Sequence, residues 1–528
     1  MTASSSTKTG TSIERPVATS PAASGVRLAL LSGLLLYLAH PPVAFGPLAW
    51  VALVPLLLSV TRSHHGHQAA WHGYLFGWAF LGPTWYWTGL TIVGWTGSAI
   101  GWLAWFGLTL ILAGFYALWG VCAWWIHRHT AGNARVLLLS AAWVTMEWAR
   151  TFGSLSMPWA QLSYTQYRWP LILQMVDLTG AYGLSGLIFL VNASIAEWWV
   201  TRATGTSFRP VYRSFQMVAA LTASALLYGL LCLNQPQQGR PLTVAALQGG
   251  FDNRTRPDFQ RYFHLTHTAI QSAPWPWPGL HVWSESAAPG DAVHDIIVRE
   301  IFSSLSTNYR AAILIGARVV APDRSETNSA VLFMPGRKQP LRYDKVQLVP
   351  FGEFIPFRRW FPPAVAQMFS FFETDVKPGV RIIPLQVETP DHEPFWIGPF
   401  ICYESMYPHY ARRMTDSGAQ LLVTISNDSW FRSVAAMEQH LAAVVLRAVE
   451  NRRDVVRSTS TGITCFVDAR GQVTARAPLE RPAALVRTVL LRDDTSLYTR
   501  AGDWFPVFCA LAIGVAVTHR PLSRRYPS

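Results

Sequence analysis

The stretch YDKVQLVPFGEFIP, residues 343–356, decides how the polar half of this chain is interpreted. It places Lys345 and Glu353 eight residues apart within an apolar frame. Two further stretches end apolar, strand-like runs with a reactive side chain: WSESA carries Glu285, and ICYE carries Cys402. Taken singly, such residues are more often solvated charges or, for cysteine, small buried hydrophobes. Three strands that each deliver one reactive group predict a single site.

Glutamate, lysine and cysteine together form a complete set for covalent acyl transfer. A cysteine attacks an acyl carbon as the thiolate, and a nearby cation such as Lys345 lowers the thiol pKa. A carboxylate such as Glu285 can take the thiol proton and later handle the proton of an attacking amine or water. Lys345 and backbone N–H groups can then stabilise the tetrahedral oxyanion.

Residues 240–495 carry the pattern of an α/β domain. Short apolar runs of strand length recur, for example at 242–247, 311–319 and 421–426, and helical patterns fall between some of them. We therefore expect α/β structure with mixed strands across this region.

The chain as a whole has the composition of a membrane protein that also carries a polar domain. Hydrophobic residues make up 50% of the chain and charged residues only 14%, against about 25% charged in soluble domains. Such values argue against an ordinary cytosolic enzyme and against disorder. A transmembrane helix needs about 20 apolar residues. The apolar segments are 27–39, 46–61, 69–91, 98–126, 134–150, 180–201, 214–234 and 503–518.

These segments predict about eight transmembrane helices, seven in residues 27–235 and one in 502–519. Arginines are concentrated in alternate connections between these segments. The positive-inside rule therefore places both termini in the cytoplasm and residues 240–495 on the outer face. Residues 1–26 are expected to form a disordered cytoplasmic tail, and 520–528 a second tail. The net charge of +13 fits membrane-flanking arginine better than nucleic-acid binding.

Several longer stretches resemble one protein family. Around the reactive residues, LVPFGEFIP, ICYES and TISNDSWF match it, and RSTSTGIT (457–464) does so further along. In the apolar half, VTMEWAR (144–150), MPWAQLSYTQ (157–166) and GAYGLSGLIFLVNA (180–193) agree. Over roughly residues 27–519 the chain resembles the apolipoprotein N-acyltransferases, a membrane-embedded branch of the nitrilase, or carbon–nitrogen hydrolase, superfamily.

This resemblance implies a nitrilase-like αββα sandwich on the periplasmic side of the bacterial inner membrane. It implies a two-step, ping-pong reaction in which a phospholipid, usually phosphatidylethanolamine, acylates the cysteine. The α-amino group of a diacylglyceryl-cysteine at an apolipoprotein N-terminus then takes the acyl chain. The expected partners are these two substrates and membrane lipids, and the protein is expected to be a monomer without metal, organic cofactor or nucleic acid.

The family's functional residues carry over by position. Cys402 resembles the acylated nucleophile, Glu285 the general base and Lys345 the triad lysine. The expected supporting residues are Glu353, Glu404, Tyr403 and Asn328, and Trp430 and Phe431 match a mobile loop near the site.

Some positions depart from the family pattern. The stretch after Gln248–Gly249 lacks the usual Trp, and Ser284 stands where a Pro usually precedes the triad glutamate. These changes leave donor and acceptor preference open, so a paralogue with altered substrates remains an alternative. Two others are a membrane-tethered amidase that uses water and a transporter or scaffold with an inactive hydrolase-like domain.

Two polar features of the apolar half have structural interpretations. Glu147 and Arg150, three residues apart on one segment, are expected to form an interfacial ion pair. His64, His65 and His67 are expected to lie in a solvated cytoplasmic turn rather than to bind a metal.

Overall fold

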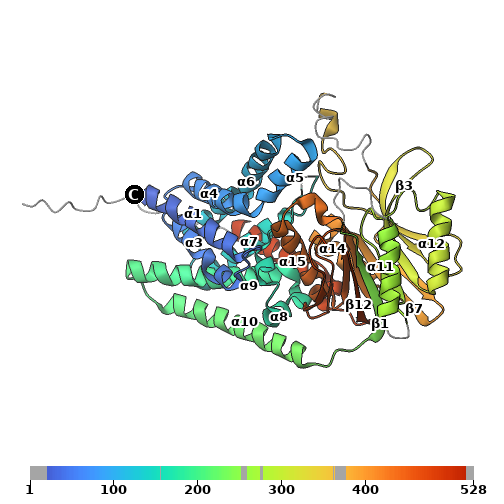
Figure 1. Cartoon of the computed structure of the whole chain (residues 1–528). Helices are drawn as coiled ribbons and strands as arrows, with labels where there is room; N and C mark the ends of the chain where they lie inside the picture. Colours follow the sequence, from blue (N-terminus) through green and yellow to red (C-terminus); the bar gives the residue numbers. More distant parts are fainter. Residues whose placement is uncertain are drawn as a thin grey trace, which may run out of the picture.

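The computed structural model describes residues 21–154, 156–250, 259–273, 277–360, 362 and 376–518. Two parts lie side by side: a bundle of helices, and two β-sheets with flanking helices (Figure 1). The chain builds the bundle first, then the sheets, and returns to the bundle with its last helix.

The helical part contains every apolar segment expected from the sequence. Its elements are α1 (Pro21–Ala39), η1 (Gly46–Leu48), α2 (Ala49–Ala52), α3 (Val54–Thr61), α4 (Gly66–Thr84), α5 (Tyr86–Thr96), α6 (Ile100–His129), α7 (Gly132–Ala149), η2 (Leu162–Gln166), α8 (Pro170–Leu173), α9 (Val176–Thr204), α10 (Arg209–Asn234) and α17 (Trp504–Thr518). Among the described residues, α6, α9 and α10 are long and apolar enough to cross a membrane. Eight spans therefore remain a prediction.

One expected segment, 69–91, is not a single helix. Pro83 lies within α4, which ends at Thr84, and α5 begins at Tyr86. Trp85 between them has φ −114° and ψ 17°. The Trp85 N–H still donates to the Leu81 carbonyl at 2.8 Å, so the helix ends just after the proline rather than at it. The break gives α5 its own direction, and α5 contacts the α/β part at residues 428–431.

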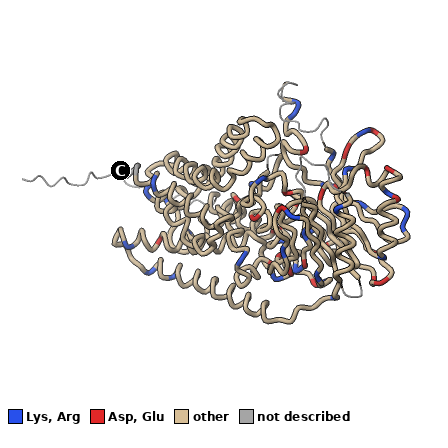
Figure 2. The backbone as a smooth tube through the Cα atoms, viewed as in Figure 1, with Lys and Arg blue, Asp and Glu red and all other residues tan. Residues whose placement is uncertain are grey.

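Charge separates the two parts clearly. Figure 2 shows few charged residues along the helices, with Lys and Arg mainly at the end away from the sheets and at the junction. Positively and negatively charged residues are intermixed over the α/β part. Helices α6 and α10 leave large apolar side chains exposed, for example Leu118 and Leu227. Apolar surface of this kind is typical of helices surrounded by lipid.

The α/β part contains two six-stranded sheets. The first has the order β12-β1-β2-β3-β4-β5 and the second β11-β10-β9-β8-β7-β6. Strands β1, β2 and β3 are parallel, as are β7, β8 and β9, and the outer pairings are antiparallel. The strands are β1 (Arg240–Gln248), β2 (Leu280–Val282), β3 (Ala312–Val320), β4 (Glu326–Phe333), β5 (Leu341–Asp344), β6 (Leu385–Thr389), β7 (His392–Ile401), β8 (Leu421–Ser426), β9 (Val455–Thr459), β10 (Cys465–Val467), β11 (Val473–Arg476) and β12 (Ala483–Leu491).

Helices cover both outer faces of the sheet pair. The first sheet carries α11 (Phe259–Ser272) and α12 (Ile296–Tyr309), and the second faces the bundle through α14 (Pro408–Asp416) and α15 (Val434–Asn451) (Figure 1). A short helix, α16 (Leu497–Ala501), precedes α17. Strand alternation explains the layering: Val244 and Ala246 join the core between the sheets, whereas Ala245 and Leu247 join the core under α11 and α12. The predicted α/β class with mixed strands is confirmed.

Candidate active site

The three reactive side chains follow the ends of three strands, as the sequence predicted. Glu285 comes three residues after β2, Lys345 directly after β5 and Cys402 directly after β7. Two of these strands belong to the first sheet and β7 to the second. Packing of the sheets brings the groups together: Lys345 Nζ lies 3.4 Å from Glu285 Oε1, and both charges act on the Cys402 thiol.

A buried lysine between two carboxylates forms the polar centre of the site. Lys345 Nζ donates to Glu353 Oε1 at 2.9 Å as well as to Glu285, and the lysine side chain is only 1% exposed. Burial alone would lower the pKa of Lys345, but Glu353 and Glu285 outweigh it and raise this pKa. The lysine therefore stays cationic.

Asn328 ties the two carboxylates to each other. Its Nδ2 donates to Glu285 Oε1 at 2.7 Å and to Glu353 Oε1 at 2.8 Å. Backbone N–H groups hold the other oxygens: Asn427 donates to Glu285 Oε2 and Val349 to Glu353 Oε2. Both carboxylates thus have fixed orientations, and the predicted supporting residues Asn328 and Glu353 lie where they can act on Glu285.

Cys402 sits on a sharp turn between β7 and η4 (Cys402–Met406), with φ +51°. Its side chain is buried, and burial raises the pKa of its thiol, with a further rise from Glu285. Lys345 lowers this pKa, as the sequence suggested, but does not outweigh the other two effects. A resting thiol of this kind needs a base.

Glu404 connects the nucleophile turn to the lysine segment. Its Oε1 accepts from Tyr343 Oη at 2.8 Å and from the backbone N–H groups of Val346 and Gln347. Its Oε2 accepts from the Ile401 N–H at 2.7 Å. Burial raises the pKa of Glu404 to about 7, although these donors lower it by stabilising the carboxylate. Glu404 positions the lysine segment beside Cys402.

Tyr403 points away from Glu285 and Lys345, toward the helical part. Its hydroxyl donates to the Ser156 carbonyl at 2.9 Å, and its ring stacks 6.5 Å from Trp159. Trp430 and Phe431, expected in a mobile loop, pack against α5. The ring centroids of Trp430 and Trp95 are 5.1 Å apart, and those of Phe431 and Trp87 are also 5.1 Å apart. Aromatic side chains of both parts therefore meet beside the nucleophile.

Sequence reasoning missed a second buried polar group behind Cys402. It consists of Ser405, Asp428, His440 and Arg457, each at most 1% exposed. Asp428 and Arg457 lie inside the stretches TISNDSWF and RSTSTGIT, which had been noted as motifs. His440 is a lone histidine on α15, and no local pattern distinguishes it from an ordinary core residue.

The expected ion pair between Glu147 and Arg150 is not among the ion pairs of the described residues. Arg150 donates instead to the carbonyls of Met157 and Trp159 and to Tyr116 Oη. Glu147 accepts from the Leu162 N–H at 2.8 Å and from an indole N–H. The chain after α7 folds back over both residues and gives each its own hydrogen-bond partners, which the spacing on one helix could not reveal.

Of the two departures from the family pattern, the one at Ser284 falls within the described residues. Ser284 Oγ lies 2.6 Å from Tyr262 Oη on α11, so a side-chain hydrogen bond stands where the family usually has proline. The stretch expected to contain a Trp, 251–257, lies outside the described residues. His64 and His65 are exposed at the turn before α4, and no metal-binding group of histidine, cysteine or carboxylates occurs in the described part of the chain.

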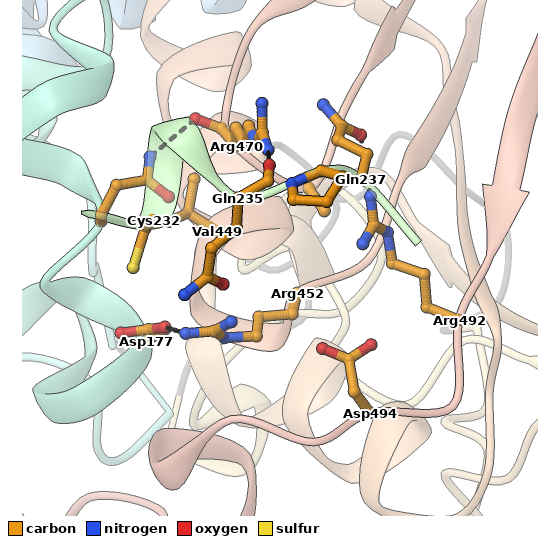
Figure 3. A pocket seen from close by; sticks show the side chains of 12 residues that line it. Asp177, Cys232, Gln235, Gln237, Val449, Arg452, Arg470, Arg492 and Asp494 are labelled. Carbon is orange, nitrogen blue, oxygen red and sulfur yellow. Dashed lines mark hydrogen bonds and ion pairs between the residues drawn. The ribbon is translucent and has the colours of Figure 1, made fainter. Parts of the chain in front are cut away.

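A small pocket of about 60 Å³ lies elsewhere, at the junction of α9, α10 and the α/β part (Figure 3). Its charged groups have partners: Arg452 pairs with Asp177, and Arg470 donates to the Gln235 carbonyl. It lies at the C-terminal end of α15, whereas His440 lies near the start of that helix. The pocket is not lined by Glu285, Lys345 or Cys402.

A two-sheet sandwich with glutamate, lysine and cysteine after its strand ends defines the class of carbon-nitrogen hydrolases, and the family model of that description matches residues 243–493. A second model, the N-terminal domain of apolipoprotein N-acyltransferase, matches residues 32–194. An apolipoprotein N-acyltransferase of Geobacter metallireducens is 33% identical, covering 92% of this chain and 94% of the relative. One from Gloeobacter violaceus is 31% identical, covering 95% of each. The chain belongs to the apolipoprotein N-acyltransferase family.

Proposed function

We propose that this protein transfers a fatty acyl chain from a membrane phospholipid to the N-terminal amino group of diacylglyceryl-cysteine in apolipoproteins, through a thioester on Cys402. The observation that carries the proposal is the buried Lys345, held between Glu285 and Glu353 beside Cys402. This set supplies a nucleophile, a base and a fixed cation. Family membership supplies the two substrates.

In the first step Glu285 removes the proton from the Cys402 thiol, whose raised pKa keeps it protonated at rest. The sulfur attacks the ester carbonyl of the phospholipid, and Lys345 stabilises the resulting oxyanion. The oxyanion collapses, the C–O bond breaks, and the lysophospholipid alkoxide takes the proton from Glu285. Cys402 is left as an acyl thioester.

In the second step the α-amino group of the apolipoprotein attacks the thioester carbonyl. Glu285 takes a proton from the amine and returns it to the departing sulfur, so that an amide forms and the free thiol is restored. Donor and acceptor occupy the site in turn, which makes the reaction ping-pong. The chain's own residues supply every proton transfer, so no metal or organic cofactor is required.

We place the α/β part on the periplasmic side of the inner membrane, carried by eight transmembrane helices with both termini cytoplasmic. Arg62, Arg128 and Arg202 lie in or beside connections at one end of the helices, which favours that end for the cytoplasm. Both lipid substrates are then within reach of the site, because Tyr403 and Phe431 beside it contact the helical part. We regard the protein as a monomer.

Intact mass spectrometry after incubation with phosphatidylethanolamine vesicles tests the thioester. We expect a gain of one fatty-acyl mass that hydroxylamine removes, that Cys402→Ser abolishes, and that a diacylated lipopeptide discharges as amide. Cys465→Ser is the matched control, because Cys465 is a buried cysteine of the same domain. An adduct released only to water would indicate an amidase instead, and an adduct that survives Cys402→Ser would refute the assignment of the nucleophile.

A further inference from the structure

Three consecutive residues of α15 hold this helix against its surroundings. Glu438 pairs with Arg476 at 2.8 Å. Gln439 binds the helical part: its Oε1 accepts from the indoles of Trp87 and Trp159. His440 faces the back of the nucleophile turn, and its side chain is fully buried. The start of α15 is therefore fixed on several sides, which makes it a rigid support.

One edge of the His440 ring contacts the nucleophile turn directly. Nε2 lies 3.1 Å from the backbone carbonyl oxygen of Cys402 and 2.5 Å from Ser405 Oγ. Ser405 Oγ itself donates to the same carbonyl at 2.8 Å. Two side chains thus converge on the carbonyl of the reactive residue.

The opposite edge of the ring is anchored by a buried ion pair. Nδ1 lies 3.2 Å from Asp428 Oδ1 and 3.1 Å from an Arg457 terminal nitrogen. Arg457 also pairs with Asp428 and donates to the Ile463 carbonyl. Burial would raise the pKa of Asp428, but Arg457 and His440 lower it to about 2, so this carboxylate is charged. The anchor is therefore ionic and has no water exposure.

At Nε2 the neighbouring Cys402 carbonyl can only accept, so a hydrogen bond to it requires a proton on Nε2. At Nδ1 the two neighbours differ, because the Asp428 carboxylate can only accept, whereas Arg457 can only donate and can bond to an unprotonated Nδ1. Burial, with a smaller effect from Arg457, lowers the pKa of His440, which agrees with a neutral ring.

Cys402 needs such support because its backbone is in the left-handed region, at φ +51°. A residue with a Cβ atom is disfavoured there and persists only where its surroundings hold it. The direction of the thiol depends on this turn, since Cβ and Sγ follow the backbone. Loss of the support would leave the lipid site in place and move the sulfur relative to Glu285.

We propose that His440, anchored by Asp428 and Arg457, is a positioning residue that fixes the Cys402 turn and thereby aims the thiol at the donor carbonyl. The inference rests on the proposed thioester function. It adds a residue outside the Glu–Lys–Cys set whose action is through the backbone of the nucleophile rather than on the substrate.

Two substitutions of His440 test the two edges of the ring separately. His440→Gln places an amide N–H where Nε2 lies and can still bind the Cys402 carbonyl, whereas His440→Asn reaches only the Nδ1 position. The measurement is single-turnover formation of the acyl-enzyme by full-length protein with phosphatidylethanolamine vesicles. We expect the acylation rate of His440→Asn to fall about 100-fold, with His440→Gln recovering about tenfold of that loss. The lipid concentration for half-maximal rate should stay unchanged in both variants.

Ser405→Ala provides a milder variant that keeps the ring, and we expect its acylation rate to fall about tenfold. His281→Asn is the control for loss of a buried histidine, because His281 has no hydrogen-bond partner for its ring among the described residues. Equal losses in the Asn and Gln variants, a change confined to lipid affinity, or a wild-type rate in His440→Asn would each overturn the proposal. If wild-type protein forms no acyl-enzyme at all, the proposed function fails instead.

Discussion

Two buried cations, Arg150 in the helical part and Lys345 in the α/β part, are stabilised in different ways. Arg150, inside the helical part, forms no ion pair with a carboxylate of the described residues and donates to carbonyl and hydroxyl oxygens. In the α/β part Lys345 lies between two carboxylates, and Arg457 pairs with Asp428. An isolated charge bound to backbone carbonyls holds the chain in place, whereas coupled charges adjust each other's protonation. The reactive chemistry is found where the charges are coupled.

Removal of the lysine should have the largest effect on chemistry. In Lys345→Met the cation opposite Glu285 and Glu353 disappears, and the oxyanion loses its fixed charge. We expect acyl-enzyme formation to slow about 1,000-fold, measured by single-turnover mass spectrometry. Lys377→Met is the matched control, because Lys377 forms an exposed pair with Asp323. A Lys345→Met protein that acylates within tenfold of wild type would contradict the role of the lysine.

Removal of the isolated charge should affect stability more than chemistry. Arg150→Met leaves the carbonyls of Met157 and Trp159 and the Tyr116 hydroxyl without a donor. We expect a loss of about 3 kcal/mol in the free energy of unfolding, seen as a lower thermal midpoint in detergent. The folded fraction should still form the acyl-enzyme. Arg128→Met, an exposed arginine at the end of α6, should leave the midpoint nearly unchanged; an equal fall in both variants would argue against the distinction.

The smallest expected effect is on the pH dependence of the alkylation rate of Cys402. Because burial and Glu285 raise the pKa of Cys402, the thiolate fraction should grow as pH rises and should not level off below the ordinary thiol value of 9.0. The alkylation rate of Cys402 should therefore increase about tenfold per pH unit through neutral pH, with Cys402→Ser as the background control. A plateau reached near pH 7 would show instead a stable thiolate–lysine pair.

Much of the site could be predicted because its residues are tied to local signals. Glu285 and Cys402 follow apolar runs of strand length, and Lys345 lies with Glu353 in one apolar motif. The α/β class and mixed strands followed from the same alternation. The eight apolar segments indicated helices for the same reason, although segments 46–61 and 69–91 are each divided into shorter elements.

Other features depended on contacts between distant parts of the chain. Asn328 reaches both carboxylates only after β4 and β5 have paired, and His440 reaches Cys402 only after α15 packs against η4. Glu147 and Arg150 looked like partners on one helix until the chain folded back over them. The sequence by itself determined which reactive groups end the strands, because period-two burial is a local property. Their orientation and protonation were decided by the tertiary structure, because both depend on neighbours that only packing brings within hydrogen-bond distance.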